Sequence, residues 1–387
     1  METGRTGMNL AEREQLRLRL REAGFDVVRF AGIEGAGGGS LAGWLAAGHH
    51  ADMAWMQRTA AKRMDARLVL SGANTVIALG VNYLPSAREP RADTSPVWAR
   101  YALHADYHDT IKPGLVKAGK ILEEISRCSS QDYRYYVDTG PVLERGWAAR
   151  AGAGFLGKNG MLISQEHGNW LFLSAIVTRL AIPPDEALRP RVPRRGGEEP
   201  AGLLCGKCTR CLDACPTRAF PAPGVVDARR CISYHTIENK GVIPRELRAG
   251  MGARIYGCDV CLEVCPWNRW ARAGRSLLLA ARGDIAALPL REILELTPAR
   301  FAEIFRGTAI KRLKLTGLLR NACVAAGNSG DGSLLEILGR LAVHESPVVR
   351  THAVWAVHRL AGKRAEALLA PARARETDAA VLTEYAG

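Results

Sequence analysis

Residues 205–216 read Cys-Gly-Lys-Cys-Thr-Arg-Cys-Leu-Asp-Ala-Cys-Pro. This is the Cys-x2-Cys-x2-Cys-x3-Cys-Pro spacing of bacterial ferredoxins, in which three thiolates bind one four-iron four-sulfur cluster and the fourth binds a second cluster. Zinc sites instead use pairs of close cysteines separated by a longer spacer, which this run does not contain. The stretch therefore predicts a ferredoxin-like module that holds two clusters.

A partial repeat of this cysteine run supplies the remaining cluster ligands. Residues 258–266, Cys-Asp-Val-Cys-Leu-Glu-Val-Cys-Pro, lack only the leading cysteine, and Cys231, alone between the runs, can replace it. The first cluster is expected on Cys205, Cys208, Cys211 and Cys265, and the second on Cys215, Cys231, Cys258 and Cys261. The other two of the ten cysteines, Cys128 and Cys323, are expected to be buried apolar side chains.

The residues on either side of the module predict its neighbours. Before it, Asn9 and Glu12 form a capping box for a first helix. Apolar runs predict four strands, at 25–30, 75–81, 133–137 and 170–177, and a helix at 115–125. We therefore expect an α+β chain, with a mixed α/β domain over 1–200, the cluster module over 201–270 and a helical domain over 271–387.

The Leu- and Ala-rich tail contains a short internal repeat. Leu-Arg-Asn-Ala-Cys-Val-Ala-Ala at 319–326 aligns with Val-Arg-Thr-His-Ala-Val-Trp-Ala at 349–356, 30 positions further on. Two such units predict HEAT-like helical repeats, with a period shorter than that class usually has. An irregular helical bundle is the alternative.

The chain is strongly basic, with a net charge of +14 and a pI of about 9.6. Such a balance suits a polyanionic partner, with nucleic acid ahead of membrane, although an Arg-rich composition alone does not require one. The Pro-, Gly- and Arg-rich stretch at 183–202 reads as a linker. Its arginines, Arg189, Arg191, Arg194 and Arg195, belong either to a solvated loop or to an RNA contact.

The sequence contains no run of 18 or more apolar residues, so no membrane-spanning helix is expected. The first ten residues contain no apolar segment of the kind that opens a secretory signal. Dense cysteines without such a signal indicate metal or cluster binding rather than disulfides. We therefore expect a cytoplasmic protein.

Several long strings in the chain resemble the epoxyqueuosine reductase family, the cobalamin-dependent iron–sulfur enzymes that complete queuosine in tRNA. They are Arg-Tyr-Ala-Leu at 100–103, Asp-Tyr-His at 106–108, Val-Asp-Thr-Gly-Pro-Val-Leu-Glu-Arg at 137–145, Gly-Lys-Asn at 157–159, Asp-Ala-Arg-Arg-Cys-Ile-Ser-Tyr at 227–234 and Thr-Ile-Glu at 236–238. Cys-Asp at 258–259 and Cys-Pro-Trp-Asn at 265–268 continue the likeness, which covers nearly the whole chain.

The resemblance implies a reaction and its site residues. Cobalamin binds in the N-terminal domain against the cluster module, and the epoxide of epoxyqueuosine at the wobble position is reduced with loss of water. Asp138 is the matching general acid, and burial beside a corrin is expected to raise its pKa and keep it protonated. The expected corrin contacts are Asp138 itself with Arg63, Tyr101, Arg229 and Ser233.

The resemblance also implies the partners. Five basic residues and no acidic one lie between Glu303 and Asp331, and we expect these to contact tRNA: Arg306, Lys311, Arg312, Lys314 and Arg320. A solvated basic helix face is the alternative for them. An external low-potential electron donor and a monomeric state complete the expectation.

Three other functions fit part of the sequence. A cobalamin-dependent reductive dehalogenase shares the cluster pattern, but such enzymes typically carry a twin-Arg export signal. A non-catalytic electron-transfer module leaves the residues before the cysteines and the Asp138 string unexplained. An RNA-binding protein with structural clusters would show no reductive turnover.

Overall fold

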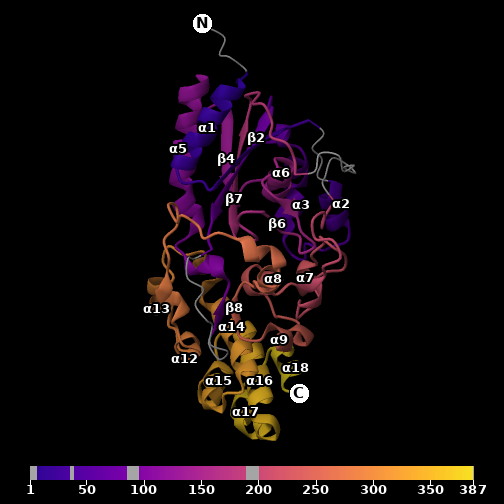
Figure 1. The fold of residues 1–387 in the computed structure, drawn as a ribbon. Coiled ribbons are helices and arrows are strands. Elements are labelled where there is room, and N and C mark those ends of the chain that lie inside the picture. Colours follow the sequence, from indigo (N-terminus) through magenta and orange to yellow (C-terminus); the bar gives the residue numbers. More distant parts are fainter. Residues whose placement is uncertain (1–6, 35–38, 85–95, 189–199, 387) are drawn as a thin grey trace.

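A computed structural model describes residues 7–34, 39–84, 96–188 and 200–386. The linker arginines Arg189, Arg191, Arg194 and Arg195 lie outside these ranges. The chain forms an elongated molecule in which the N-terminal sheet occupies one end, the tail helices occupy the other, and the cysteine module lies between them (Figure 1). Within the described ranges, no helix is long and apolar enough to cross a bilayer.

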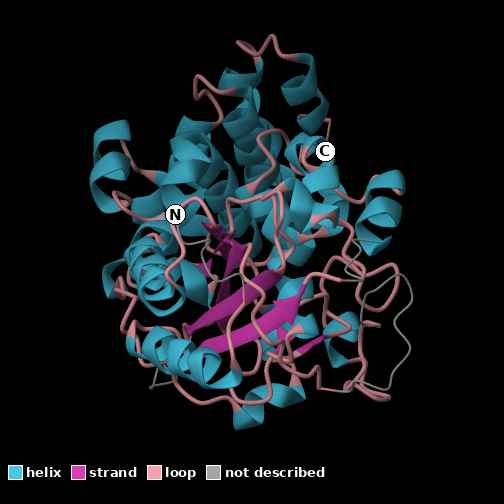
Figure 2. Ribbon diagram, turned by 90° about the horizontal axis from the view of Figure 1, so that it is seen from above, coloured by secondary structure: helices cyan, strands magenta, loops and turns pink. Residues whose placement is uncertain are grey.

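A four-stranded antiparallel sheet forms the centre of the N-terminal half (Figure 2). Its order is β1 (Val27–Gly32), β2 (Thr75–Asn82), β7 (Leu171–Thr178) and β4 (Tyr133–Val137). The four strands predicted from apolar runs are these four, each within two residues. Every residue of β2 is buried, because helices cover both faces of the sheet.

Helices α1 (Leu10–Glu22) and α5 (Tyr107–Ser126) cover one face of the sheet, and α6 (Glu144–Arg150) covers the other (Figure 1). Three short helices follow β1: α2 (Gly39–Ala46), α3 (Ala54–Arg58) and α4 (Ala60–Met64). The capping box of α1 is confirmed, because the Asn9 and Glu12 side chains each accept a 2.9 Å hydrogen bond from the other residue's backbone N–H.

Short elements connect the sheet to the cysteine module. β5 (Phe155–Leu156) and β6 (Leu162–Ile163) form a small hairpin, and β3 (Val97–Trp98) pairs in parallel with β8 (Arg254–Tyr256). The module's helices are α7 (Arg210–Asp213), α8 (Ile232–Ile237), α9 (Arg245–Met251) and α10 (Val260–Glu263). The single-turn helices α7 and α10 pack together, and each contains the last cysteine of a Cys-x2-Cys pair.

The tail is helical, as predicted. Its helices are α11 (Gly283–Ala286), α12 (Leu290–Leu294), α13 (Pro298–Ile304), α14 (Lys314–Ser329), α15 (Leu335–Leu341), α16 (Pro347–Ala361), α17 (Ala365–Arg373) and α18 (Ala379–Glu384). The two aligned segments lie in α14 and α16, which pack against each other. Their assignment to HEAT repeats stays a prediction.

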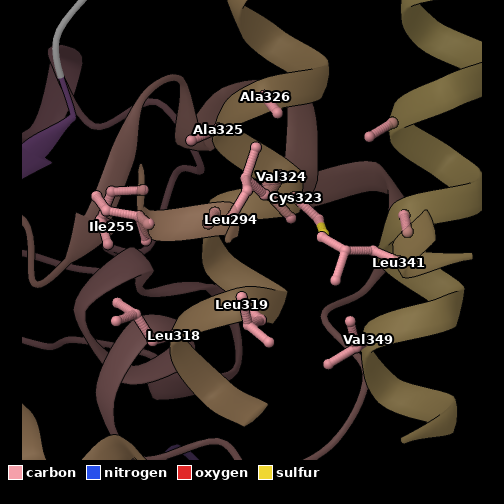
Figure 3. Close-up of a cluster of buried hydrophobic side chains, with 14 of the residues drawn as sticks. Ile255, Leu294, Leu318, Leu319, Cys323, Val324, Ala325, Ala326, Leu341 and Val349 are labelled. Carbon is pink, nitrogen blue, oxygen red and sulfur yellow. The ribbon is translucent and has the colours of Figure 1, made fainter. Parts of the chain in front are cut away.

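One apolar core joins the tail to the cysteine module. Figure 3 shows Cys323 of α14 among Leu319, Leu341 and Val349, with Ile255 of β8 in the same cluster. Cys323 is fully buried, as predicted, whereas Cys128 is only half-buried. The expected domain boundary at residue 270 therefore crosses a continuous core.

A candidate active site beside two sets of four cysteines

Asp138 lies at the end of β4 with a backbone φ of +56°. This left-handed conformation is costly for a non-glycine residue and is typical of functional turns. The Tyr107 hydroxyl donates a 2.6 Å hydrogen bond to Asp138 Oδ2, and His108 Nε2 lies 3.4 Å from the same oxygen. The Asp138 side chain is nevertheless 56% exposed, so it faces open space.

The N-terminus of α5 supplies the partners of Asp138. Asp106 caps this helix by accepting from the His108 backbone N–H, and its Oδ1 lies 2.7 Å from His108 Nδ1. The Tyr107 ring stacks on His108 at 4.1 Å and on Phe172 of β7 at 4.4 Å. The imidazole is thus fixed between two carboxylates and an aromatic face.

The protein groups around Asp138 shift its pKa in the opposite direction from the shift expected beside a corrin. Burial would raise the pKa of its carboxyl, but the ion pair with His108, the hydrogen bond from Tyr107 and the charge of Arg312 hold the pKa below its ordinary value. Burial would likewise lower the pKa of His108, but the Asp106 and Asp138 carboxylates raise it to about 9. At neutral pH the proton therefore resides on His108, and Asp138 is ionised.

A second carboxyl in the site has the opposite behaviour. Burial raises the pKa of Glu144, at the start of α6, to about 8, and the charge of Asp138 adds to the rise, while Arg63 and Arg145 oppose it. Glu144 Oε1 is buried with no hydrogen-bond partner among the described residues. One ionised and one protonated carboxyl in a single site are characteristic of acid–base chemistry.

Two of the predicted corrin contacts lie in this group. Arg63 donates to the carbonyl of Val142 at 3.2 Å, and burial lowers its pKa although the charges of Glu144 and Asp138 oppose this shift. Tyr101 packs edge-on against Tyr107, with ring centroids 6.1 Å apart. Both side chains are therefore brought to the surroundings of Asp138.

The other two predicted corrin contacts are not joined to Asp138 by any contact of the described residues. Arg229 forms a bidentate ion pair with Asp227, at 2.8 Å for each nitrogen, and its Nη2 lies 3.3 Å from His49 Nδ1. Ser233 lies in α8, and its backbone N–H, with that of Tyr234, opposes the burial that raises the pKa of Cys231.

All eight cysteines of the module are partly buried free thiols, and several of them shift one another's pKa. Burial, followed by the charges of Cys205, Cys265 and Cys208, raises the pKa of Cys211 to about 11. Burial raises the pKa of Cys261, and the charges of Cys258, Cys231, Cys215 and Cys211 add to the rise. Cys211 belongs to the first predicted set and the other three to the second, so the division into two ligand sets stays a prediction.

No three His, Cys, Asp or Glu side chains of the described ranges lie close enough together to share one metal ion. A cubane does not require such a group, because each thiolate binds a different iron atom.

Aromatic side chains connect the second set to Asp138. The charge of Cys261 contributes to the raised pKa of Tyr83, after burial and Asp259. The Tyr83 ring lies 4.7 Å from Phe172, which stacks on Tyr107, the hydrogen-bond donor to Asp138. Cys261 and Tyr107 thus pack against the same apolar cluster.

The first set lies toward the surface. Cys265 lines an open cavity of about 1030 Å³, together with Trp170 and residues of α7 and α10. Three arginines line the same cavity: Arg100, Arg210 and Arg269. A cluster on the first set would thus be the one that a partner reaches from outside.

Polar side chains of the N-terminal half fix the cysteine loops. Lys158 Nζ donates to the carbonyls of Gly206 and Cys208 at 2.8 and 3.0 Å. Asn159 Nδ2 donates to Asn169 and, at 3.3 Å, to the carbonyl of Cys261. Each cysteine set is therefore tied to the sheet domain by one of two consecutive residues.

Four of the five expected tRNA contacts are exposed, and one expectation is wrong. Arg306, Lys311, Arg312 and Lys314 lie on the surface around η5 (Ala309–Leu313). Arg312 donates to Glu238 Oε1 at 2.5 Å, and its charge acts on Asp138. Arg320 is fully buried and donates to the carbonyls of three residues, His235, Asn239 and Gly241, so it is unavailable to RNA.

Several site residues had no role assigned from sequence. Tyr107, His108, Glu144, Lys158 and Asn159 all belong to strings that carry the family resemblance. The available signal was their position in those strings, because Tyr107 and His108 lie 31 and 30 residues from Asp138 along the chain and meet it only through the packing of α5 on β4.

Two family descriptions match the chain. Residues 204–268 match the 4Fe-4S double cluster binding domain, and residues 63–139 match epoxyqueuosine reductase QueG, DUF1730. The epoxyqueuosine reductase of Vibrio cholerae is 38% identical over 333 residues, covering 84% of this chain and 85% of the relative. That of Gloeobacter violaceus is 39% identical over 330 residues, covering 82% and 96%. That of Escherichia coli K12 is 36% identical over 322 residues, covering 82% and 81%.

Solved structures are similar over nearly the whole chain. A crystal structure of epoxyqueuosine reductase with an epoxyqueuosine-modified tRNA-Tyr stem loop has a TM-score of 0.83 at 29% identity, covering 97% of this chain and 96% of that chain. The Bacillus subtilis enzyme, with the catalytic loop that carries an aspartate swung out of the active site, has a TM-score of 0.81 at 28% identity, covering 97% of each. The mixed α/β fold with a double-cluster domain is thereby confirmed.

Proposed function

The chain belongs to the epoxyqueuosine reductase family, and on this premise we propose that it reduces epoxyqueuosine to queuosine at the wobble position of tRNA. The observation that carries the proposal is the position of Asp138. It faces open space at a strand end and has a proton-bearing histidine beside it, and its hydrogen-bond donor Tyr107 belongs to the same apolar cluster as Cys261.

The similar structures support both the substrate and the residue. One of them contains an epoxyqueuosine-modified tRNA stem loop, and another is described by the movement of a catalytic loop that carries an aspartate. Asp138 also lies on a loop, and its positive φ gives that loop a strained conformation.

The cysteines suit two four-iron four-sulfur clusters. Cys205, Cys208, Cys211 and Cys265 would hold the outer cluster, and Cys215, Cys231, Cys258 and Cys261 the inner one. Each cluster passes single electrons. We propose that an external low-potential donor delivers electrons at the outer cluster, because Cys265 lines the open cavity. The inner cluster then lies on the way to Asp138.

The surroundings of Asp138 also fit cobalamin, which carries many amide side chains and a flat corrin ring. Two buried polar atoms have no hydrogen-bond partner among the described residues: Glu144 Oε1 and Ser174 Oγ, the latter on β7 directly opposite Val137. Unpaired buried groups of this kind indicate an additional ligand. Arg63 and Tyr101 would hold the cofactor, with Arg229 and Ser233 as further proposed contacts. When bound, it supplies low-potential cobalt chemistry at the substrate.

The protein's own residues supply the proton that the leaving oxygen needs. An epoxide oxygen is a poor leaving group until it is protonated, so a positioned acid lowers the barrier. We assign this role to Asp138 Oδ2, which the Tyr107 hydroxyl orients at 2.6 Å. Because Asp138 is ionised in the free protein, it must gain a proton before it can donate one.

The basic surface around η5 is the proposed tRNA contact, formed by Arg306, Lys311, Arg312 and Lys314. Its connection with the site is Arg312, whose charge acts on Asp138. An anticodon loop is unpaired, so its wobble base can enter the site while the phosphates remain on this surface. We further propose a monomer in the cytoplasm, organised as the three domains expected from sequence, with HEAT-like repeats in the tail.

A substrate test separates this function from its alternatives. Anaerobic protein with both clusters and cobalamin is reduced, and its visible absorbance is followed after addition of tRNA with epoxyqueuosine, unmodified tRNA or a small organohalide. Reoxidation by the epoxyqueuosine tRNA alone is expected. Reoxidation by the organohalide alone would identify a reductive dehalogenase, and reoxidation by none of the three would favour an electron-transfer or RNA-binding protein.

A further inference from the structure

The proposed reaction needs more protons than one carboxyl can carry. Reduction of an epoxide to an alkene breaks both C–O bonds, forms one C=C bond, consumes two electrons and two protons, and releases water. The electrons come from the external donor through the clusters. Asp138 can give one proton and must then be reprotonated before the oxygen leaves as water.

We propose that His108 is the residue that stores and delivers these protons, passing them from its Nε2 to Asp138 Oδ2, with Asp106 holding the imidazole in place. This inference rests on the proposed function. His108 acts through Asp138 and is therefore a positioning residue, whereas Asp138 meets the substrate.

The geometry supports a relay in one direction. Asp106 Oδ1 lies 2.7 Å from Nδ1, which directs the other ring nitrogen toward Asp138. That nitrogen is buried, has no hydrogen-bond partner among the described residues, and lies 3.4 Å from Asp138 Oδ2. A small movement of the Asp138 loop would close this gap to hydrogen-bond length. Stacking against Tyr107, itself packed on Phe172, prevents the ring from turning away.

The charges around the histidine favour its protonated form. Asp106 and Asp138 face it from the start of α5 and from the end of β4, and together they outweigh burial and raise its pKa to about 9. Tyr107 bears no charge at neutral pH, because burial and Asp138 raise the pKa of its hydroxyl. The positive charge of Arg312, in η5, lowers the pKa of both Asp106 and Asp138. It therefore disfavours protonation of these two carboxylates.

Proton transfer from His108 to Asp138 balances in bonds and in charge. The N–H bond of the imidazolium breaks and an O–H bond forms on Asp138, so neutral His108 and a neutral carboxyl replace the ion pair. Asp138 then protonates the epoxide oxygen. A solvent proton restores His108, and a second transfer by the same path supplies the water that leaves. No oxidant or reductant takes part in these steps.

Glu144 is the rival proton source. Burial raises its pKa to about 8, and it feels the charge of Asp138, but no hydrogen bond joins the two carboxyls. His108 is preferred because its Nε2 lies 3.4 Å from Asp138 Oδ2 and a second carboxylate, that of Asp106, holds its other ring nitrogen.

A titration that does not depend on turnover tests the relay first. Full-length protein with both clusters is labelled with 13C-histidine, and His108→Gln identifies the His108 signal among the nine histidines. A pKa near 9 is expected, falling in Asp106→Asn and in Asp138→Asn because each change removes a stabilising carboxylate. A pKa near 6.5 in the unaltered protein would overturn the proposal.

Kinetics then compare the two proton sources. With epoxyqueuosine tRNA, His108→Gln is expected to lower the single-turnover rate about 100-fold and to abolish the fall in rate above pH 9. Asp106→Asn should move that fall to lower pH, and the remote His358→Gln should leave the profile unchanged. If Glu144→Gln abolishes the fall and His108→Gln does not, the relay is wrong and the proposed function stands. If the unaltered protein forms no queuosine, the proposed function is wrong. The titration then still tests whether Asp106 and Asp138 raise the pKa of His108.

Discussion

Gly140 fixes the loop that carries Asp138. A Cβ atom at this position would lie 2.3 Å from the Tyr136 ring, closer than any real contact. Gly140→Ala should therefore displace the loop and reduce queuosine formation by at least about 10-fold, since small misplacements of reacting groups are costly. Iron content should not change. Gly146→Ala is the matched control, because its Cβ would meet nothing within 4 Å. Equal activity in the two variants would contradict this role for the loop.

Arg320 is expected to act on stability. Its guanidinium donates to three buried backbone carbonyls, and burial lowers its pKa to about 10. Arg320→Met leaves these carbonyls unpaired and should lower the free energy of unfolding by about 3 kcal/mol. Thermal denaturation of the cluster-loaded protein measures the effect, with exposed Arg306→Met as the control. A variant as stable as the control would show that the carbonyls find other partners.

The sequence indicated Asp138 as the acid but not its protonation. The residues that lower its pKa, His108 and Tyr107, lie 30 and 31 positions away and contact Asp138 only through packing. The expected tRNA contact of Arg320 is wrong for the same reason. A basic residue in a basic stretch gives no sign that the carbonyls of His235, Asn239 and Gly241 surround it. Charged residues can be counted from the sequence, but the residues that they pair with in the fold cannot be identified from it.

At the scale of elements, the Gly157–Asn159 turn is the joint between the sheet and the clusters. Lys158 donates to two carbonyls of the loop that holds Cys205 and Cys208. Lys158→Met should loosen this loop and lower the iron content toward that of one cluster per chain, with the inner cluster retained. Iron and sulfide analysis of anaerobic protein measures this. Exposed Lys207→Met, in the same loop, should keep its full iron content. Full iron content in both variants would contradict the role of Lys158 in holding this loop.

Strands were predictable from their apolar runs, and a double-cluster module from the cysteine spacing, whereas the division of the cysteines into two sets stays a prediction. The pairing of the strands was not, because a run of apolar residues buried on both faces carries no register. The antiparallel order β1-β2-β7-β4 depends on which connections the helices make. The parallel β3–β8 pair was also beyond reach, since it joins residues more than 150 positions apart.

At the scale of the whole molecule, the basic surface around η5 should make tRNA binding depend on salt. Replacement of Arg306, Lys311 and Lys314 by Gln should reduce the slope of log affinity against log salt by about 2, because fewer counterions are released. Titrations at several salt concentrations measure it. The same change at three exposed residues of the tail's far end, Arg359, Lys363 and Arg364, should leave the slope nearly unchanged. Equal effects would mean that binding follows net charge and not this surface.

The expected three-domain division is less distinct in space than along the chain. The tail core includes Ile237, Leu247 and Ile255 of the cysteine module, and Trp98 from the N-terminal half. A helical tail is evident from composition, whereas its fusion with the module depends on apolar residues far apart in sequence. The basic surface, the inner cysteines and Asp138 are consequently held in one fixed arrangement.

The most direct test of this account is the product itself. Anaerobic protein with both clusters loaded is mixed with cobalamin, a low-potential reductant and tRNA that carries epoxyqueuosine, and the digested nucleosides are analysed by mass spectrometry beside Asp138→Asn. We expect queuosine from the unaltered protein and at least about 100-fold less from the variant, which keeps its clusters. Absence of queuosine from protein with full iron and bound cobalamin would contradict the proposed reaction, and equal product from the variant would contradict the role of Asp138.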